Sequence, residues 1–547
     1  MSAETGFDPI TLEVLWSRLI SIVDEAGISI VRTSFSTTVR ESHDFGCVLL
    51  DREGNSLAQL TSSIPSFIGT LPRTMKHFLR QFPAESWRPG DLVFTNDPWI
   101  GTGHLPDITS AYPVFCRGRL VAFMGVISHV VDIGGKLRAP DVRELFEEGL
   151  RLMPCKYISG GRVNEEIRTI IRHNVRVPDQ VEGDILAQVG AAELGARRIV
   201  ELMEEHGLED LRGLAKAIHL RSEDAMRAAI AEVPDGDYDC RLTMDGFEED
   251  LTLQVRVSVR GSDILVDYTG TSPQVDRALN VVPNYAYAYT VFPIKCALEP
   301  TLPNNEGCFR PIRVSAPEGC LLNPRFPAAV NARAMVGHYC VPAVFGALAQ
   351  AIPEKVQAAS GSPIWAVTTT GVDKYGERFA NNWFLNGGQG ATAHSDGGSC
   401  LSFPSNVSNT SIEVIENTAP QLFECKEIIP DSGGAGRFRG GNSQRVALRC
   451  TADEPVTLTF LADRTRSPAF GLVGGRAGRR GSITLNGEEI NPKKTYLLRE
   501  GDRLVLEVPG GGGFGEPRER DPSLILADLE EGMVTPETAR EVYGYRL

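Results

Sequence analysis

The sequence predicts an α+β protein with a mixed, multi-domain body. Three observations support this prediction. The chain has 547 residues, which is more than one small hydrophobic core accommodates. Residues 141–233 carry long amphipathic patterns typical of helices, and residues 234–520 carry alternating, β-branched patterns typical of strands. We therefore expect an N-terminal α/β region at 1–140 and a helical tail at 521–547.

The N-terminal region begins with a predicted helix. Asp8 is a suitable N-cap and Pro9 suits the first helical position, where its missing N–H costs nothing. Apolar residues recur at helical spacing as far as Ile30. Strands are predicted next, at 44–51, 92–96, 112–115 and 120–128.

The remaining elements follow the same reasoning. Residues 163–175 and 185–207 predict amphipathic helices, and Pro536 marks the second of two short C-terminal helices. Glycine-rich joints lie at 387–390, 433–441 and 510–513. The last two could cradle an anion, but neither clearly follows a strand and opens a helix, so tight turns are favoured.

Composition excludes several classes of protein. The net charge of −15 argues against a nucleic-acid partner, which would need clustered Lys and Arg. No apolar run is long enough to span a membrane, and the first residues lack the pattern of a signal peptide. The 11 cysteines never form CxxC, which fits free thiols in a reducing compartment. We expect a cytoplasmic protein.

Two histidine contexts are candidates for a metal site. His104 and His129 each follow or end a predicted strand, and each precedes an aspartate by three residues, Asp107 and Asp132. Imidazole and carboxylate ligands suit Mn²⁺, Fe²⁺ or Zn²⁺ and leave positions open for water or substrate. The alternative is that each His–x–x–Asp pair only stabilises a turn or caps a helix.

Other chemistries are missing from the chain. It has no GxxxxGK[ST] phosphate loop and no GxSxG nucleophile motif. Residues 40–44, Arg-Glu-Ser-His-Asp, form a dense charged cluster, although such a cluster usually marks a solvated face or turn.

Longer motifs resemble one known family over nearly the whole chain, from about Asp8 to the C-terminus. They include NDPWIGTGHLPDITSAYPVF, SHVVDIGG, LFEEGLRLMPCKY, NPRFPAAVNAR, NVSNTSIEVIE, PDSGGAGRFRGG and PGGGGFGEPRERDPSLILADLEEGMVT. These motifs, in this order, resemble the hydantoinase B/oxoprolinase family.

The resemblance implies a subunit of a hetero-oligomer. Such B-type subunits associate with an A-type subunit that has an actin-like ATPase fold. In lactam-opening members, the A-type subunit phosphorylates a small cyclic amide and the B-type subunit completes hydrolysis at a metal site. Related enzymes carboxylate acetone or acetophenone. ATP would thus act through the partner, which agrees with the missing phosphate loop.

The resemblance to acetone carboxylase also implies a ligand set. His104, Asp107 and His129 would hold the metal, with Glu41 as the fourth ligand. Glu41 or Asp132 would orient or deprotonate the attacking water. Asp132, together with Asp97, would also orient the imidazoles.

This chain departs from the family pattern at two positions. Phe67 and Val130 stand where many lactam-opening relatives carry histidine, so a second site or proton relay of those relatives is in doubt. Three hypotheses therefore remain at this point: an ATP-dependent cyclic-amide hydrolase subunit, a carboxylase subunit, and a non-catalytic scaffold for an ATPase partner.

Overall fold

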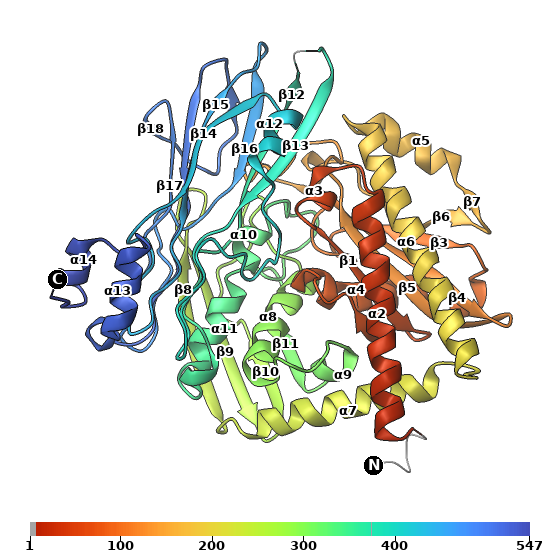
Figure 1. Ribbon diagram of the computed structural model, residues 1–547. Coiled ribbons are helices and arrows are strands. Elements are labelled where there is room, and N and C mark those ends of the chain that lie inside the picture. Colours follow the sequence, from red (N-terminus) through yellow and green to blue (C-terminus); the bar gives the residue numbers. More distant parts are fainter. Residues whose placement is uncertain (1–6, 374, 547) are drawn as a thin grey trace.

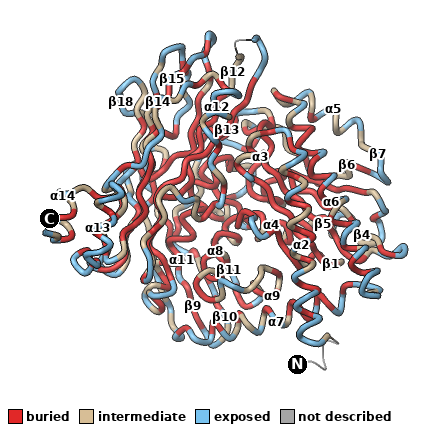
Figure 2. The backbone as a smooth tube through the Cα atoms, in the orientation of Figure 1, coloured by how far each residue is buried: buried red, intermediate tan, exposed pale blue. Residues whose placement is uncertain are grey.

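The computed structural model of the protein describes residues 7–373 and 375–546. Helices and four hydrogen-bonded sheets pack against one another, which confirms the predicted α+β class (Figure 1). Buried residues run through the centre of every sheet, and exposed residues follow the periphery (Figure 2). None of the helices described here is long and apolar enough to cross a membrane.

A seven-stranded sheet organises the N-terminal part, in the order β2-β1-β5-β4-β3-β6-β7. Its strands are β1 (Phe45–Asp51), β2 (Ser56–Gln59), β3 (Leu92–Thr95), β4 (Asp107–Cys116), β5 (Arg119–His129), β6 (Cys155–Ser159) and β7 (Arg162–Val163). Side chains alternate between its faces. In β1, Val48 and Leu50 join one apolar core, and Cys47 and Leu49 join another. Both faces of the sheet are therefore covered.

Helices pack on both faces of this seven-stranded sheet. On one face lie α2 (Pro9–Thr33), α6 (Pro178–Glu205) and α7 (Arg212–Ala231). On the other face α4 (Pro65–Gln81) packs against β1 and β5. The predicted N-cap of the first helix is confirmed, because Asp8 Oδ1 accepts hydrogen bonds from two main-chain N–H groups at 3.0 and 3.1 Å. Two shorter helices, α3 (Thr37–Arg40) and α5 (Glu165–Asn174), flank this layer.

A central layer joins the two halves. Its sheet has the order β11-β10-β9-β8, and the long helix α8 (Pro283–Leu298) lies between α4 and α11 (Cys340–Leu348). The other elements are β8 (Gly236–Met244), β9 (Leu251–Arg260), β10 (Asp263–Asp267), β11 (Ile312–Ser315), α9 (Glu306–Phe309) and α10 (Ala334–Gly337). Gly69 of α4 lies so close to α8 that an added Cβ would meet Ala288 Cβ at 2.6 Å.

The C-terminal part is a sandwich of two sheets, β13-β12-β16-β19 and β14-β15-β20-β17-β18, around one apolar core. Its strands are β12 (Trp365–Val372), β13 (Arg378–Leu385), β14 (Gln421–Ile428), β15 (Gln444–Cys450), β16 (Val456–Leu461), β17 (Ser482–Leu485), β18 (Glu488–Glu489), β19 (Tyr496–Leu498) and β20 (Arg503–Glu507). Helix α12 (Ile412–Thr418) lies beside it. The two predicted terminal helices are confirmed as α13 (Pro522–Glu530) and α14 (Pro536–Glu541).

The three glycine-rich segments do more than form tight turns. They stack on one another by main-chain hydrogen bonds, such as Gly434 N to Gly511 O at 2.7 Å and Gly511 N to Gly441 O at 3.0 Å. A Cβ on Gly388 would lie 1.7 Å from Gly441 O. Only glycine permits backbones to approach this closely, so these residues serve packing.

The content of two predicted ranges is more mixed than expected. Strands β6 and β7 lie within the range 141–233, and the long helix α8 lies within the range 234–520. Helix α8 is apolar on nearly all sides because it is buried between other helices, so it lacks the one-sided pattern that marks a surface helix.

Candidate metal centre

Two paired strands bring an imidazole and a carboxylate together. Asp107 is the first residue of β4 and His129 is the last residue of β5, and the antiparallel register places them directly opposite each other. His104 lies in the loop before β4. This loop bends at Gly103, whose φ is +98° and where a Cβ would lie 2.7 Å from Arg333 Cδ. A glycine is therefore required beside His104.

The three side chains converge on one point. His104 Nε2 lies 2.7 Å from Asp107 Oδ1, and His129 Nδ1 lies 2.8 Å from the same oxygen. One ligand atom from each residue lies within 4.8 Å of the other two, and all three residues are buried. Across residues 7–373 and 375–546, this is the group of His, Cys, Asp or Glu side chains that could hold a metal ion.

The donor set fits a transition metal. His104 Nε2 is buried and has no hydrogen-bond partner, although a carboxylate oxygen lies 2.7 Å away. A buried polar atom without a partner costs about 1–3 kcal/mol, and a cation bound by both His104 and Asp107 would remove this cost. Two imidazoles and one carboxylate suit Mn²⁺, Fe²⁺ or Zn²⁺ and leave coordination positions open.

The second oxygen of Asp107 is already occupied. Thr102 Oγ1 donates to Asp107 Oδ2 at 2.5 Å, and Arg333 Nη2 lies 2.7 Å from the same oxygen. Arg333 also donates from Nε to the main-chain oxygen of Thr102 at 2.6 Å and stacks on the Tyr285 ring at 4.2 Å. These contacts fix the carboxylate with Oδ1 facing the imidazoles.

Electrostatics keep the three groups ready to bind a cation. Burial and the nearby Arg333 guanidinium hold the pKa of His104 well below its usual range. Burial and Arg138 lower the pKa of His129 to about 4. Burial opposes ionisation of Asp107, yet His104 and Arg333 outweigh it and hold the pKa of that carboxyl well below its usual range. Neutral imidazoles and an ionised carboxylate are the forms that bind metals.

A second acidic group, Asp44, lies beside the cluster. Its main-chain oxygen accepts a hydrogen bond from His129 N at 3.0 Å, and its Oδ2 lies 3.7 Å from Arg138 Nη2. Arg138 Nη2 also lies 3.0 Å from His129 Nε2. Burial, together with the charge of Asp107, raises the pKa of Asp44 to about 7. Asp44 belongs to the charged cluster at 40–44, from which the family resemblance favours Glu41 instead.

The other predicted carboxylates do not belong to the three-residue group among the described residues. Glu41 ends helix α3, is half-buried and is not part of the three-residue group. Asp97 pairs with Arg151 and accepts a hydrogen bond from Trp99 N at 2.9 Å. Asp132 Oδ1 lies 2.6 Å from Arg176 Nη1 and accepts from Gly134 N at 3.0 Å. These contacts of Asp97 and Asp132 hold loops rather than imidazoles.

Phe67 and Val130, which stand where many relatives carry histidine, are apolar core residues in this chain. Both are fully buried and belong to the large core that includes β1 and α4. A Cβ on Gly46 of β1 would lie 3.0 Å from Phe67 Cβ, so the ring fills the space beside that strand.

The sequence did not predict the role of Glu148, a buried residue that holds the segment next to His104 in place. Glu148 Oε1 accepts hydrogen bonds from Val330 N at 2.5 Å and Asn331 N at 2.8 Å. The main-chain oxygen of Asn331 lies 3.5 Å from His104 Nδ1, and Arg333 follows two residues later. Glu148 therefore holds the segment that contacts both His104 and Asp107. In the sequence, Glu148 and Arg333 are marked only by the family motifs that contain them, LFEEGLRLMPCKY and NPRFPAAVNAR.

The fold and the buried His/Asp cluster define a helix-and-sheet protein with a site able to hold a metal. The chain belongs to the hydantoinase B/oxoprolinase family, whose family model matches residues 8–517.

Relatives of similar length support this assignment. A Pseudomonas sp. (strain NS671) protein described as the B subunit of a D-/L-hydantoinase is 32% identical, over 98% of this chain and 95% of its own length. The beta subunit of caprolactamase from Pseudomonas jessenii is 30% identical, over 98% of this chain and 96% of its own length. The 5-oxoprolinase of Dictyostelium discoideum is 27% identical, and the match covers 94% of this chain but 41% of that protein.

Two solved structures share the fold. The ATP-dependent caprolactamase of Pseudomonas jessenii has a TM-score of 0.90 at 28% identity, covering 99% of this chain and 97% of that chain. Nucleotide-free acetone carboxylase also has a TM-score of 0.90, at 20% identity, covering 100% of this chain and 80% of that chain. The second likeness shows the fold alone.

Proposed function

We propose that the protein is the metal-binding B-type subunit of an ATP-dependent cyclic-amide hydrolase. The observation that carries this proposal is the convergence of His104, Asp107 and His129 on one buried point, with neutral imidazoles and an ionised carboxylate. The names of the relatives support the reaction class, since they include a hydantoinase subunit, a caprolactamase subunit and 5-oxoprolinases.

The names and lengths of the relatives support a partner subunit, which we propose to be an A-type ATPase. The matched relatives of similar length are described as subunits, whereas this chain covers 41% of the 5-oxoprolinase of Dictyostelium discoideum. The remainder of that longer protein would correspond to a second functional part carried on the same chain. In our proposal a separate subunit supplies this part, uses ATP and phosphorylates the amide.

Residues around the three ligands suit the second half of such a reaction. A metal ion held by His104, Asp107 and His129 would lower the pKa of a bound water and polarise the scissile carbonyl. In this proposal Asp44, a buried carboxyl beside Arg138, would accept the proton of the attacking water on its carboxylate. The Arg138 and Arg333 guanidiniums, both buried, would stabilise an anionic or phosphorylated intermediate.

The experiment is reconstitution with an A-type subunit. The two subunits are expressed together, and ATP hydrolysis is measured with caprolactam, hydantoin and 5-oxoproline, and separately with ketones plus bicarbonate. We expect amide-dependent ATP turnover and ring opening that Asp44→Asn lowers about 10²–10⁴-fold. The exposed His173→Ala is the matched control and keeps full activity.

Each outcome distinguishes one alternative. Bicarbonate-dependent turnover of a ketone, with no amide opened, would replace the hydrolase by a carboxylase. A complex that forms but turns over neither the amides nor the ketones would identify a scaffold. In that case His104→Ala and His129→Ala would form the complex as well as the unmodified chain does.

A further inference from the structure

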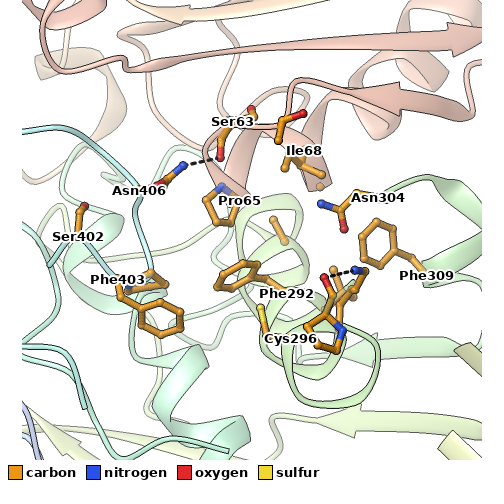
Figure 3. Close-up of a pocket in the computed structure, with 17 residues that line it drawn as sticks. Ser63, Pro65, Ile68, Phe292, Cys296, Asn304, Phe309, Ser402, Phe403 and Asn406 are labelled. Carbon is orange, nitrogen blue, oxygen red and sulfur yellow. Dashed lines mark hydrogen bonds between the residues drawn. The ribbon is translucent and has the colours of Figure 1, made fainter. Parts of the chain in front are cut away.

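A cavity lies along the C-terminal half of α8 (Figure 3). Its volume is about 320 Å³, which lies within the usual range for small-molecule sites. Three distant stretches of chain form its walls: residues 61–69, residues 288–309 and residues 402–406. At ~30 Å³ per water-sized group, the cavity accommodates a molecule of about ten non-hydrogen atoms.

This cavity is separate from the metal centre. Tyr285, which stacks on Arg333 beside Asp107, lies near the start of α8, whereas Phe292 and Lys295 line the cavity further along the helix. A helix rises 1.5 Å per residue, so Phe292 lies about 10 Å along the axis from Tyr285. The metal-ligand candidates are not among the residues that line the cavity.

Most of the wall is apolar. Pro65 and Ile68 from α4, Phe292 from α8 and Phe309 face a common space with Phe403 (Figure 3). The segment that carries Phe403 is tied to the N-terminal layer, since Asn406 Nδ2 donates to the main-chain oxygens of Ser62 at 3.1 Å and Ser63 at 3.2 Å. The cavity is therefore preformed by contacts between elements that are far apart in the sequence.

The polar part of the wall carries positive charge. Lys295 is buried, and its Nζ donates to the main-chain oxygens of Leu302 and, at 3.3 Å, of Pro300. An ammonium has three donors, so one remains for a ligand. No Asp or Glu appears among the lining residues. Burial lowers the pKa of Lys295, and the nearby charge of Glu299 partly opposes this shift.

A helix terminus adds to this charge. Helix α4 begins at the cavity with Pro65, and the residue before it provides no side-chain cap. The amino end of a helix carries partial positive charge that favours anions. Lys295 and the start of α4 thus lie on the wall of one apolar cavity that no Asp or Glu lines.

We propose that this cavity binds a small organic carboxylate with an apolar body. The carboxylate would accept a hydrogen bond from Lys295 Nζ near the amino end of α4, while the apolar body fills the space between Ile68, Phe292 and Phe403. This site is a second small-molecule site of the chain, and it does not depend on the reaction at the metal centre.

The test is calorimetric titration of the full chain with three probes of equal length: hexanoate, hexanol and hexylamine. Hexanoate is expected to bind at least ten times more tightly than the other two. Ile68→Trp, at a half-buried position, fills the cavity and should weaken hexanoate binding at least tenfold. Lys295→Gln removes the charge and should do the same, with the circular dichroism spectrum and melting temperature confirming that it folds.

Two control variants test whether hexanoate binds at this cavity or elsewhere on the chain. Lys76→Met removes a cation from the same helix α4 outside the cavity, where it pairs with Glu306 at 2.9 Å, and should leave binding within twofold. His104→Ala disrupts the metal centre and should also leave it within twofold.

The contrary outcomes are equally distinct. Equal affinity for hexanol would overturn the carboxylate assignment, and loss of binding in His104→Ala would move the ligand to the metal centre. Failure of all three probes to bind, or unchanged binding in Ile68→Trp, would overturn the site.

Discussion

Replacing Glu148 with glutamine should change how stability depends on pH. Burial raises the pKa of Glu148 from its ordinary 4.5 to about 8, although Asn331 N and Val330 N donate to it. Between these two pH values, the unfolded chain releases the proton while the folded chain retains it. Folding stability therefore falls as pH rises through this window. At about 1.4 kcal/mol per pH unit, the contribution changes by about 3 kcal/mol between pH 5.5 and 7.5.

A glutamine at this position removes the titration and keeps a carbonyl oxygen to accept both N–H groups. The melting temperature of Glu148→Gln relative to the unmodified chain should therefore rise as pH is raised from 5.5 to 7.5. Differential scanning calorimetry at several pH values measures this. Glu144→Gln, at an exposed carboxyl of the same segment, is the matched control and should show no such trend. A difference that is the same at every pH would refute the reasoning.

Two further changes test the packing and the site. Gly69→Ala should destabilise the fold by about 1–3 kcal/mol, because its Cβ would meet main-chain and side-chain atoms of Ala288. The control is Gly190→Ala in α6, where an added Cβ meets nothing within 4 Å. This control should be neutral or stabilising in the same thermal melt. Equal effects of the two changes would contradict the close approach of α4 and α8. Arg333→Met should weaken metal affinity about 10–100-fold, measured by titration, since it removes the contacts that orient Asp107. Unchanged affinity would show that this orientation has no role.

Local patterns predicted much of the fold. The cap at Asp8, the strand around 45–51 and the helix around 178–205 were all visible because their signals lie within a few neighbouring residues. The helix α8 was not predicted, because a helix buried between other helices has no polar face to mark its period.

The site was predictable only in part. His104, Asp107 and His129 could be predicted together because Asp107 and His129 lie opposite each other on paired strands and His104 lies three residues before Asp107. Arg333 and Glu148 reach the same place from distant segments, and no pattern in one sequence encodes such contacts. Asp44 shares a charged cluster with Glu41, which caps helix α3 and is half-buried, whereas Asp44 is buried, and the spacing alone does not tell the two apart.

Metal content is the most direct test of the central claim that His104, Asp107 and His129 hold one metal ion. The purified chain, loaded with Mn²⁺, Fe²⁺ or Zn²⁺ and dialysed, is analysed by mass spectrometry for metal per chain. We expect about one equivalent that is lost in His104→Ala, Asp107→Asn and His129→Ala, and is retained in the exposed His173→Ala. A full equivalent remaining in the three ligand variants would contradict the account.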